Sequence, residues 1–177
     1  TSMISRNLFT ESKNLRIFDF DDTIVKTNSY IYVTHNNGMK SKLTPGQYAV
    51  YTEKPGDVYD FKDFEQVKEP QEIQKITKIL RGIVQKSKEV VYILTARAAY
   101  QPIKKYLSDI GINSQKIYVV ALASNNPKDK ADWIENMIDK EGYDDIYFVD
   151  DSEKNVSAAK QMLKTKNVKW RVQHIKH

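Results

Sequence analysis

The sequence contains no cysteine, no long apolar run and no glycine-rich phosphate loop. Without cysteine the chain cannot form disulfides, use a thiolate nucleophile or bind metal through sulfur. No apolar run approaches the ~18 residues of a membrane helix, and no signal-peptide pattern opens the chain, so we expect a cytoplasmic protein without a membrane span. The lack of a Gly-x-x-x-x-Gly-Lys motif argues against a nucleotide-triphosphate P-loop. We interpret Thr1 and Ser2, which precede Met3, as a cloning remnant.

Length and composition fit a single globular domain over residues 1–177. With 177 residues, 40% of them hydrophobic and 29% charged, the chain can bury about two thirds of its unfolded surface. The formal net charge of +5 favours an anionic substrate, such as a phosphorylated molecule or a nucleic acid. No obligate protein partner is evident in the sequence.

Short apolar runs alternate with amphipathic stretches along most of the chain. The runs predict strands at 15–18, 90–94, 116–120, 146–149 and 168–172. Most are nearly all apolar, as in strands buried on both faces, whereas the alternation in the last run suits an edge strand. Apolar residues three and four apart predict helices at 70–88, with Pro70 in its first turn, and at 98–110, 129–140 and 153–165. This order predicts an α/β fold, a Rossmann-like parallel sheet sandwiched by helices.

Residues 24–69 interrupt the pattern directly after the first strand. Residues 29–34 favour a strand, and Asn36-Asn37-Gly38 is a strong hairpin turn before residues 39–43. Two Pro-Gly pairs further along mark additional turns. We therefore expect a β-hairpin flap followed by an irregular segment, which together form a small cap. A structureless stretch of this length in a compact domain is usually functional.

Acidic and hydroxyl side chains follow the predicted strands at their carboxyl ends. Asp19 and Asp21 follow the first strand, Thr95 the second, and Asp150 and Asp151 the fourth. Ligands bind beyond the carboxyl ends of strands in open parallel sheets, so we expect these side chains to lie together. Carboxylates at close range repel one another unless a divalent cation binds, and a set of oxygen ligands favours Mg²⁺ over zinc. The sequence therefore predicts a magnesium site at this edge.

In type and order these residues resemble the motifs of the haloacid dehalogenase superfamily of phosphatases, from Ile17 to about Ala159. The motifs are Asp19-Phe20-Asp21-Asp22-Thr23, then Ile93-Leu94-Thr95, then Lys130 or Lys128, and finally Phe148-Val149-Asp150-Asp151. The first and fourth motifs at this separation are a strong signal, whereas the lysine alone is a weak one. We favour Lys130 over Lys128 because it lies nearer the helical face that carries Ala131 and Trp133.

The resemblance implies a small-cap phosphatase with a role for each of these residues. Asp19 attacks phosphorus, and Asp21 protonates the leaving oxygen and later takes a proton from water. Thr95 and the lysine bind the phosphoryl oxygens. Asp151, supported by Asp150, completes the Mg²⁺ site with Asp19 and the backbone carbonyl of Asp21. Family members often have glycine at the position of Asp150, and the paired acids resemble those of polynucleotide phosphatase domains.

The sequence leaves the identity of the substrate and the roles of several side chains undecided. An open site and a positive net charge favour nucleotides or nucleic-acid ends, with sugar phosphates as the alternative. A non-catalytic phosphate-binding module is a second alternative. A signalling receiver domain is disfavoured because its paired acids come before its lysine in the chain. Arg97 either binds the substrate phosphate or is a solvated side chain, and the sequence does not decide between the two. Thr23 is interpreted as stabilising its turn. The three histidines are interpreted as solvated, namely His35, His174 and His177.

Overall fold

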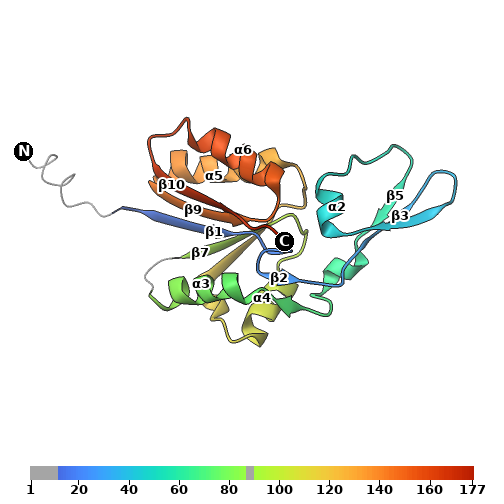
Figure 1. Ribbon diagram of the computed structural model, residues 1–177, viewed down its shortest axis with the longest axis horizontal. Helices are drawn as coiled ribbons and strands as arrows, with labels where there is room; N and C mark the ends of the chain where they lie inside the picture. The colour runs from blue at the N-terminus through green and yellow to red at the C-terminus, as the bar shows by residue number, and fades with distance from the viewer. Residues whose placement is uncertain (1–11, 87–89) are drawn as a thin grey trace, which may run out of the picture.

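The computed structural model describes residues 12–86 and 90–177, and its centre is a five-stranded parallel sheet (Figure 1). The strands, in the spatial order β10-β9-β1-β7-β8, are β10 (Lys169–His174), β9 (Asp145–Asp150), β1 (Asn14–Phe18), β7 (Val91–Thr95) and β8 (Ile117–Ala121). The five predicted strands are confirmed to within about two residues. The run at 168–172 belongs to an edge strand, as its alternation predicts. Thr1 and Ser2 lie outside the described residues.

Helices cover both faces of this sheet. Helices α3 (Gln74–Gln85) and α4 (Gln101–Asp109) lie on one face, and α5 (Pro127–Glu141) and α6 (Glu153–Leu163) lie on the other (Figure 1). Successive residues of β1 point to opposite faces, so Phe18 joins the apolar cluster of α3 and α4, while Ile17 joins that of α5 and α6. The chain is therefore an α/β protein with a helix-flanked parallel sheet, as expected.

Two predicted helices begin later than the sequence pattern indicates: α4, expected over 98–110, starts at Gln101, and α3 differs by more. The helix expected over 70–88 starts at Gln74, and Gln71–Glu72 form strand β6. Strand β6 pairs antiparallel with β2 (Val25–Lys26), and the Ile73 N–H donates to the Ile24 carbonyl at 2.8 Å. The prediction for 70–73 is wrong because pairing with the segment after β1 overrides the helical periodicity. The expected last residues, 87 and 88, lie outside the described part of the chain.

The insert forms a small sheet beyond the carboxyl ends of the main strands (Figure 1). Its elements are β3 (Ile31–Thr34), β4 (Lys40–Leu43), helix α2 (Pro45–Ala49), β5 (Val58–Asp60) and the 3-10 helix η1 (Lys62–Glu65). The β3–β4 hairpin is confirmed, and Gly38 takes the positive φ of 84° that its turn requires. The segment expected to be irregular is ordered instead, because β5 pairs with the free edge of β3.

The hairpin turn is fixed by a histidine that the sequence interpretation took as solvated. The two ring nitrogens of His35 lie 2.8 Å from Asp57 Oδ2 and 2.8 Å from Ser41 Oγ. Asp57 also accepts the Asn36 N–H at 2.9 Å. The interpretation of His35 as solvated is therefore wrong, because its ring joins the turn to both neighbouring segments of the insert.

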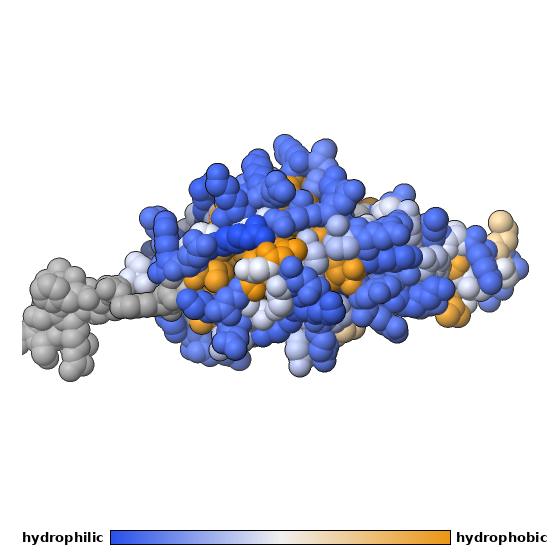
Figure 2. All heavy atoms as spheres, turned by 90° about the horizontal axis from the view of Figure 1, so that it is seen from below, coloured by the Kyte–Doolittle hydropathy of each residue, from blue (hydrophilic) through white to orange (hydrophobic). Residues whose placement is uncertain are grey.

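Seen from the side of α3 and α4, the surface is mostly hydrophilic, with apolar side chains gathered near its middle (Figure 2). Larger exposed apolar side chains also occur on the insert, where Met39 and Val58 are exposed. Among the described residues, no helix combines the length and the apolar character that crossing a membrane requires.

Candidate active site

Asp19 lies directly after β1, at the edge of the sheet that faces the insert. Its N–H donates to the Val149 carbonyl at 2.9 Å, which continues the pairing of β1 with β9 by one residue. Its Oδ1 accepts a hydrogen bond from Lys130 Nζ at 2.8 Å, and its Oδ2 accepts one from Thr23 Oγ1 at 2.9 Å. The backbone and two side chains thus fix this buried carboxylate, and Thr23 contributes more than the turn that the sequence indicated.

Lys130 is the lysine that reaches the acidic residues. Its Nζ lies 2.8 Å from Asp19 Oδ1 and 2.9 Å from Asp150 Oδ2, and its side chain is 4% exposed. Burial alone would lower the pKa of Lys130, but Asp150 and Asp19 raise it above the ordinary lysine value, so the side chain stays charged. Lys128 instead pairs with Asp132 at 2.7 Å on the exposed side of α5. Of the two candidate lysines, Lys130 therefore lies in the site.

The paired acids at the end of β9 have different surroundings. Asp150 is fully buried and accepts hydrogen bonds from the Ser152 N–H at 2.8 Å, Lys130 Nζ at 2.9 Å and Asn155 Nδ2 at 3.1 Å. Asp151 is half-buried and lines the cavity described below. Asp150 is thus bonded within the protein and Asp151 borders the cavity, and the roles of the two acids towards a metal stay a prediction.

Asp19, Asp150 and Asp151 form an acidic cluster that can hold a metal ion, because one oxygen of each lies within 4.8 Å of the others. Burial and then Asp150 raise the pKa of Asp19 well above its ordinary value, and burial raises that of Asp151 to about 6. Three carboxylates beside one ammonium group leave an excess of two negative charges when all are ionised. Two oxygens bound to one Mg²⁺ lie at most about 4.2 Å apart, so a small contraction would bring all three onto one ion.

Asp21 does not join this cluster through its side chain. Its two carboxylate oxygens accept hydrogen bonds from Arg97 Nε and Nη2, both at 2.8 Å. Arg97 is buried, and its Nη1 also donates to the carbonyls of Phe64 at 3.3 Å and Gln66 at 3.1 Å. Arg97 is therefore not a solvated side chain. The role of the Asp21 backbone carbonyl as a metal ligand stays a prediction.

Thr95 ends β7 and is fully buried. Its Oγ1 accepts the backbone N–H of Arg97 at 3.1 Å, so the hydroxyl stabilises the turn that carries Arg97. The cavity wall at this point consists of Ala96 and Arg97 rather than Thr95. The predicted contact between the Thr95 hydroxyl and a phosphoryl oxygen stays a prediction.

The C-terminal segment contacts the backbone of both acidic motifs. The Nε2 atom of His174 lies 3.0 Å from the Asp151 carbonyl, and that of His177 lies 2.6 Å from the Asp22 carbonyl. The interpretation of His174 as solvated is therefore wrong, because its ring is partly buried, whereas His177 is exposed as expected and contacts Asp22 through one ring nitrogen only. No local sequence signal indicates these contacts; they follow from β10 pairing beside β9, which brings the chain end to the site edge of the sheet (Figure 1).

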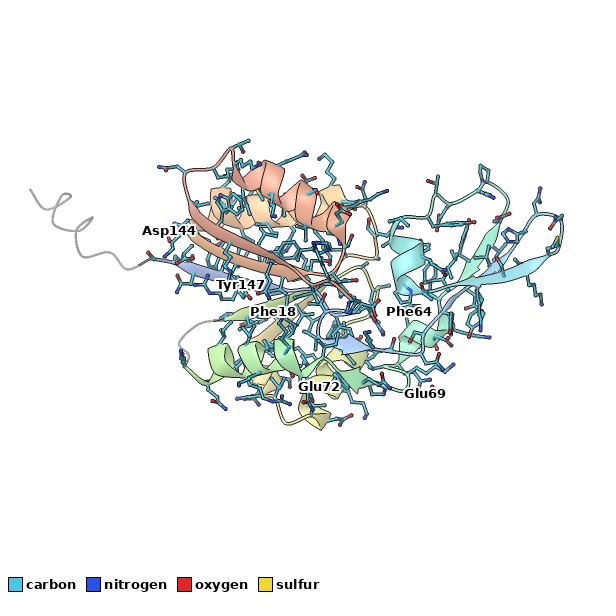
Figure 3. All side chains as sticks on the ribbon, in the orientation of Figure 1. Phe18, Phe64, Glu69, Glu72, Asp144 and Tyr147 are labelled. Carbon is cyan, nitrogen blue, oxygen red and sulfur yellow. The ribbon has the colours of Figure 1, made fainter. Side chains whose placement is uncertain are left out.

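A cavity of about 550 Å³ separates the acidic cluster from the insert. The insert contributes mainly apolar and aromatic side chains, namely Ile31, Pro45, Tyr48, Ala49, Phe61 and Phe64. Phe64 lies where the insert meets the core (Figure 3). Two hydrogen bonds join the core to the insert: Asn125 Nδ2 donates to the Tyr48 carbonyl at 2.9 Å, and Arg97 Nη1 donates to the Phe64 carbonyl. The insert thus walls one side of the site, which is less open than the expected flap implied.

Comparisons of the chain with models of protein families, with curated proteins and with solved structures gave no match.

Proposed function

We propose that this chain is a Mg²⁺-dependent phosphomonoesterase of the haloacid dehalogenase type that forms an aspartyl-phosphate on Asp19. The observation that carries the proposal is the surroundings of Asp19: Lys130 lies 2.8 Å from one oxygen, and two further carboxylates complete a cluster within 4.8 Å. A carboxylate is a weak nucleophile, and adjacent positive charge lets it approach an anionic phosphoryl group. The unbalanced negative charge of the cluster supports a bound divalent cation as a second source of this positive charge. The oxygen ligands of the cluster suit Mg²⁺.

Asp19 and Asp151 would hold the ion, with Asp150 in support, and bound Mg²⁺ would offset charge on the phosphoryl oxygens. In the first step an Asp19 oxygen bonds to phosphorus, the ester P–O bond breaks, and the leaving oxygen takes a proton from Asp21. In the second step water attacks phosphorus, gives its proton to Asp21, and the bond from phosphorus to Asp19 breaks to release inorganic phosphate. Lys130 balances negative charge on Asp19 and the transferring group.

The insert side of the cavity favours a leaving group with a flat ring, and nucleotides therefore stand ahead of sugar phosphates. Phe61 is 43% exposed although it lines the cavity, and its ring packs edge-on against Tyr48, with centroids 5.4 Å apart. Exposed aromatic rings stack on nucleobases with little dependence on sequence. A volume of about 550 Å³ lies in the range of small-ligand sites, so a nucleic-acid end would enter through its terminal nucleotide.

Phosphate release from mononucleotides, 3′- or 5′-phosphorylated oligonucleotides, sugar phosphates and p-nitrophenyl phosphate tests this proposal. We expect turnover in Mg²⁺ that stops with EDTA, and a loss of roughly 10³-fold or more in Asp19→Asn. Hydroxylamine trapping during turnover should mark Asp19 in the mass spectrum. Asp132→Asn, on the exposed side of α5, is the matched control and should keep full activity. Absence of turnover on every substrate, or an Asp19→Asn variant within tenfold of the parent, would contradict the proposal.

A further inference from the structure

Arg97 connects the loop after β7, the carboxylate of Asp21 and the insert. Its Nε and Nη2 each lie 2.8 Å from an oxygen of Asp21, and its Nη1 donates to the carbonyls of Phe64 and Gln66 at 3.3 and 3.1 Å. The Arg97 side chain is 2% exposed. The guanidinium cannot turn to a phosphate in the cavity without breaking contacts on two sides.

Aromatic rings and a backbone hydrogen bond fix the same guanidinium further. Its central carbon lies 5.3 Å from the ring centroid of Phe20, which follows Asp19 in the core, and 4.8 Å from that of Phe64 in the insert. The Arg97 N–H donates to Thr95 Oγ1 at 3.1 Å, so the base of the side chain is held as well. The plane of the guanidinium, and with it the direction of the Asp21 carboxylate, therefore depends on where the insert lies.

We propose that Arg97 is a positioning residue that couples the place of the insert to the ability of Asp21 to transfer a proton. The proposal rests on the proposed function, because it assigns Arg97 to the proton-transfer step of that reaction. With the insert docked, the two carbonyls hold Nη1 and the bidentate pair aims Asp21 along the cavity that both residues line. When the insert moves away, Nη1 loses those partners and Asp21 loses its fixed direction.

The proposal predicts a dependence on the leaving group. A poor leaving group, such as the alcohol of a nucleotide, needs a proton as its bond to phosphorus breaks, whereas 2,4-dinitrophenolate leaves without one. The ratio kcat/KM reports the steps up to the phosphoenzyme, so the later attack of water does not enter. A misplaced Asp21 carboxylate should therefore reduce kcat/KM for the nucleotide and leave kcat/KM for the dinitrophenyl ester nearly unchanged.

The test measures kcat/KM of Arg97→Lys for a mononucleotide and for 2,4-dinitrophenyl phosphate. Lysine keeps the charge but cannot form the bidentate pair and reach both carbonyls. We expect a fall of about tenfold or more for the nucleotide and less than about threefold for the dinitrophenyl ester. Arg97→Gln, which keeps a planar N–H donor, is measured alongside in case the lysine variant does not fold. In an Asp21→Asn background, Arg97→Lys should have no further selective effect.

Arg81→Lys is the control for the loss of a structural arginine. Arg81 also binds a carboxylate and a carbonyl, with Nη1 2.8 Å from Glu72 Oε2 and Nη2 2.8 Å from the Ile110 carbonyl. Glu72 lies beside α3, away from Phe64 (Figure 3). Arg81→Lys should change kcat/KM for both substrates by the same factor or leave both values unchanged. Equal losses on the two substrates in Arg97→Lys, or a selective loss that persists without Asp21, would overturn the coupling. A parent protein that hydrolyses neither substrate would remove the proposed function itself, and the coupling with it.

Discussion

The acidic residues at the edge of the main sheet and those of the insert differ in how their charge is satisfied. At the sheet edge, burial and neighbouring carboxylates raise the pKa of Asp19, and burial raises that of Asp151. In the insert, the hydrogen bond from His35 lowers the pKa of Asp57. Burial would raise the pKa of Asp63, but hydrogen bonds from the Tyr32 hydroxyl and the Tyr30 N–H outweigh it, and the result is a lowered value.

The contrast separates acids whose charge is balanced within the protein from acids that can hold a metal ion. Asp63 receives hydrogen bonds at 2.8 Å and 3.1 Å from two tyrosines and lies 3.6 Å from Lys68 Nζ, so its charge is balanced within the protein. Asp19 shares Lys130 with Asp150, and Asp151 completes the cluster, so the three carboxylates when ionised keep an excess of two negative charges that a bound cation can balance. Carboxylates with perturbed pKa values that line a cavity are candidates for function, whereas Asp57 and Asp63 are paired within the insert.

The largest expected effect on stability comes from removing the charged side chain of Lys130, which lies between Asp19 and Asp150. In Lys130→Met, Asp19 and Asp150 remain buried without their shared positive charge, so the free energy of unfolding should fall by about 3–5 kcal/mol without metal. Chemical denaturation at pH 7 in EDTA measures this loss. Lys128→Met, in the same helix, removes only an exposed ion pair and should leave the free energy of unfolding close to that of the parent. Similar stabilities for the two variants would show that Lys130 does not balance the cluster.

Much of this site could be predicted because it follows from strand ends. Near-continuous apolar runs define β7 and β9, and parallel pairing brings the residues after them beside Asp19. Lys130 could also be predicted, since helical spacing places it on the buried face of α5. These parts depend on local periodicity and on one topological rule.

The partners of Asp21 could not be predicted in this way. Arg97 reaches Asp21 only because the chain turns after Asp19 and because the insert presents two backbone carbonyls, and neither feature has a residue pattern. Strand β6 was missed for a similar reason, since a two-residue pairing is too short to show a period. Both of these features depend on how distant segments meet rather than on the pattern within an element.

The stability that the acidic cluster contributes should change with pH in the direction opposite to the stability that the acids of the insert contribute. Because the pKa of Asp151 is raised to about 6 in the folded state, its contribution to stability is full below its unfolded pKa of about 3.9 and is lost as pH rises through 6. Without metal, Asp151→Asn should therefore be more stable than the parent at pH 7, by about 1–2 kcal/mol, and the gap should close towards pH 4. Melting temperatures in EDTA across this range measure the gap.

The response of the melting temperature to Mg²⁺ should also distinguish the acidic cluster from the acids of the insert. Millimolar Mg²⁺ should raise the melting temperature of the parent at pH 7, less so at pH 5, where protons compete for the carboxylates, and should leave Asp151→Asn unchanged. Asp57→Asn serves as the matched control and should keep the Mg²⁺ response, because Asp57 pairs with His35 away from the cluster. A parent protein that does not respond to Mg²⁺ would contradict the assignment of the cluster as a metal site.

The smallest expected effect comes from the insert and has the opposite pH dependence. The pKa of Asp63 is lowered in the folded state, so its contribution is present above the unfolded pKa of about 3.9 and is lost as pH falls through the lower folded value. Asp63→Asn should lose about 1 kcal/mol at pH 7, because an amide accepts the bonds from Tyr30 and Tyr32 less strongly than a carboxylate does. The difference from the parent should shrink below pH 4, whereas that of Asp151→Asn shrinks between pH 6 and pH 4. If both variants followed the same pH course, the division between structural and ligand-binding acids would fail.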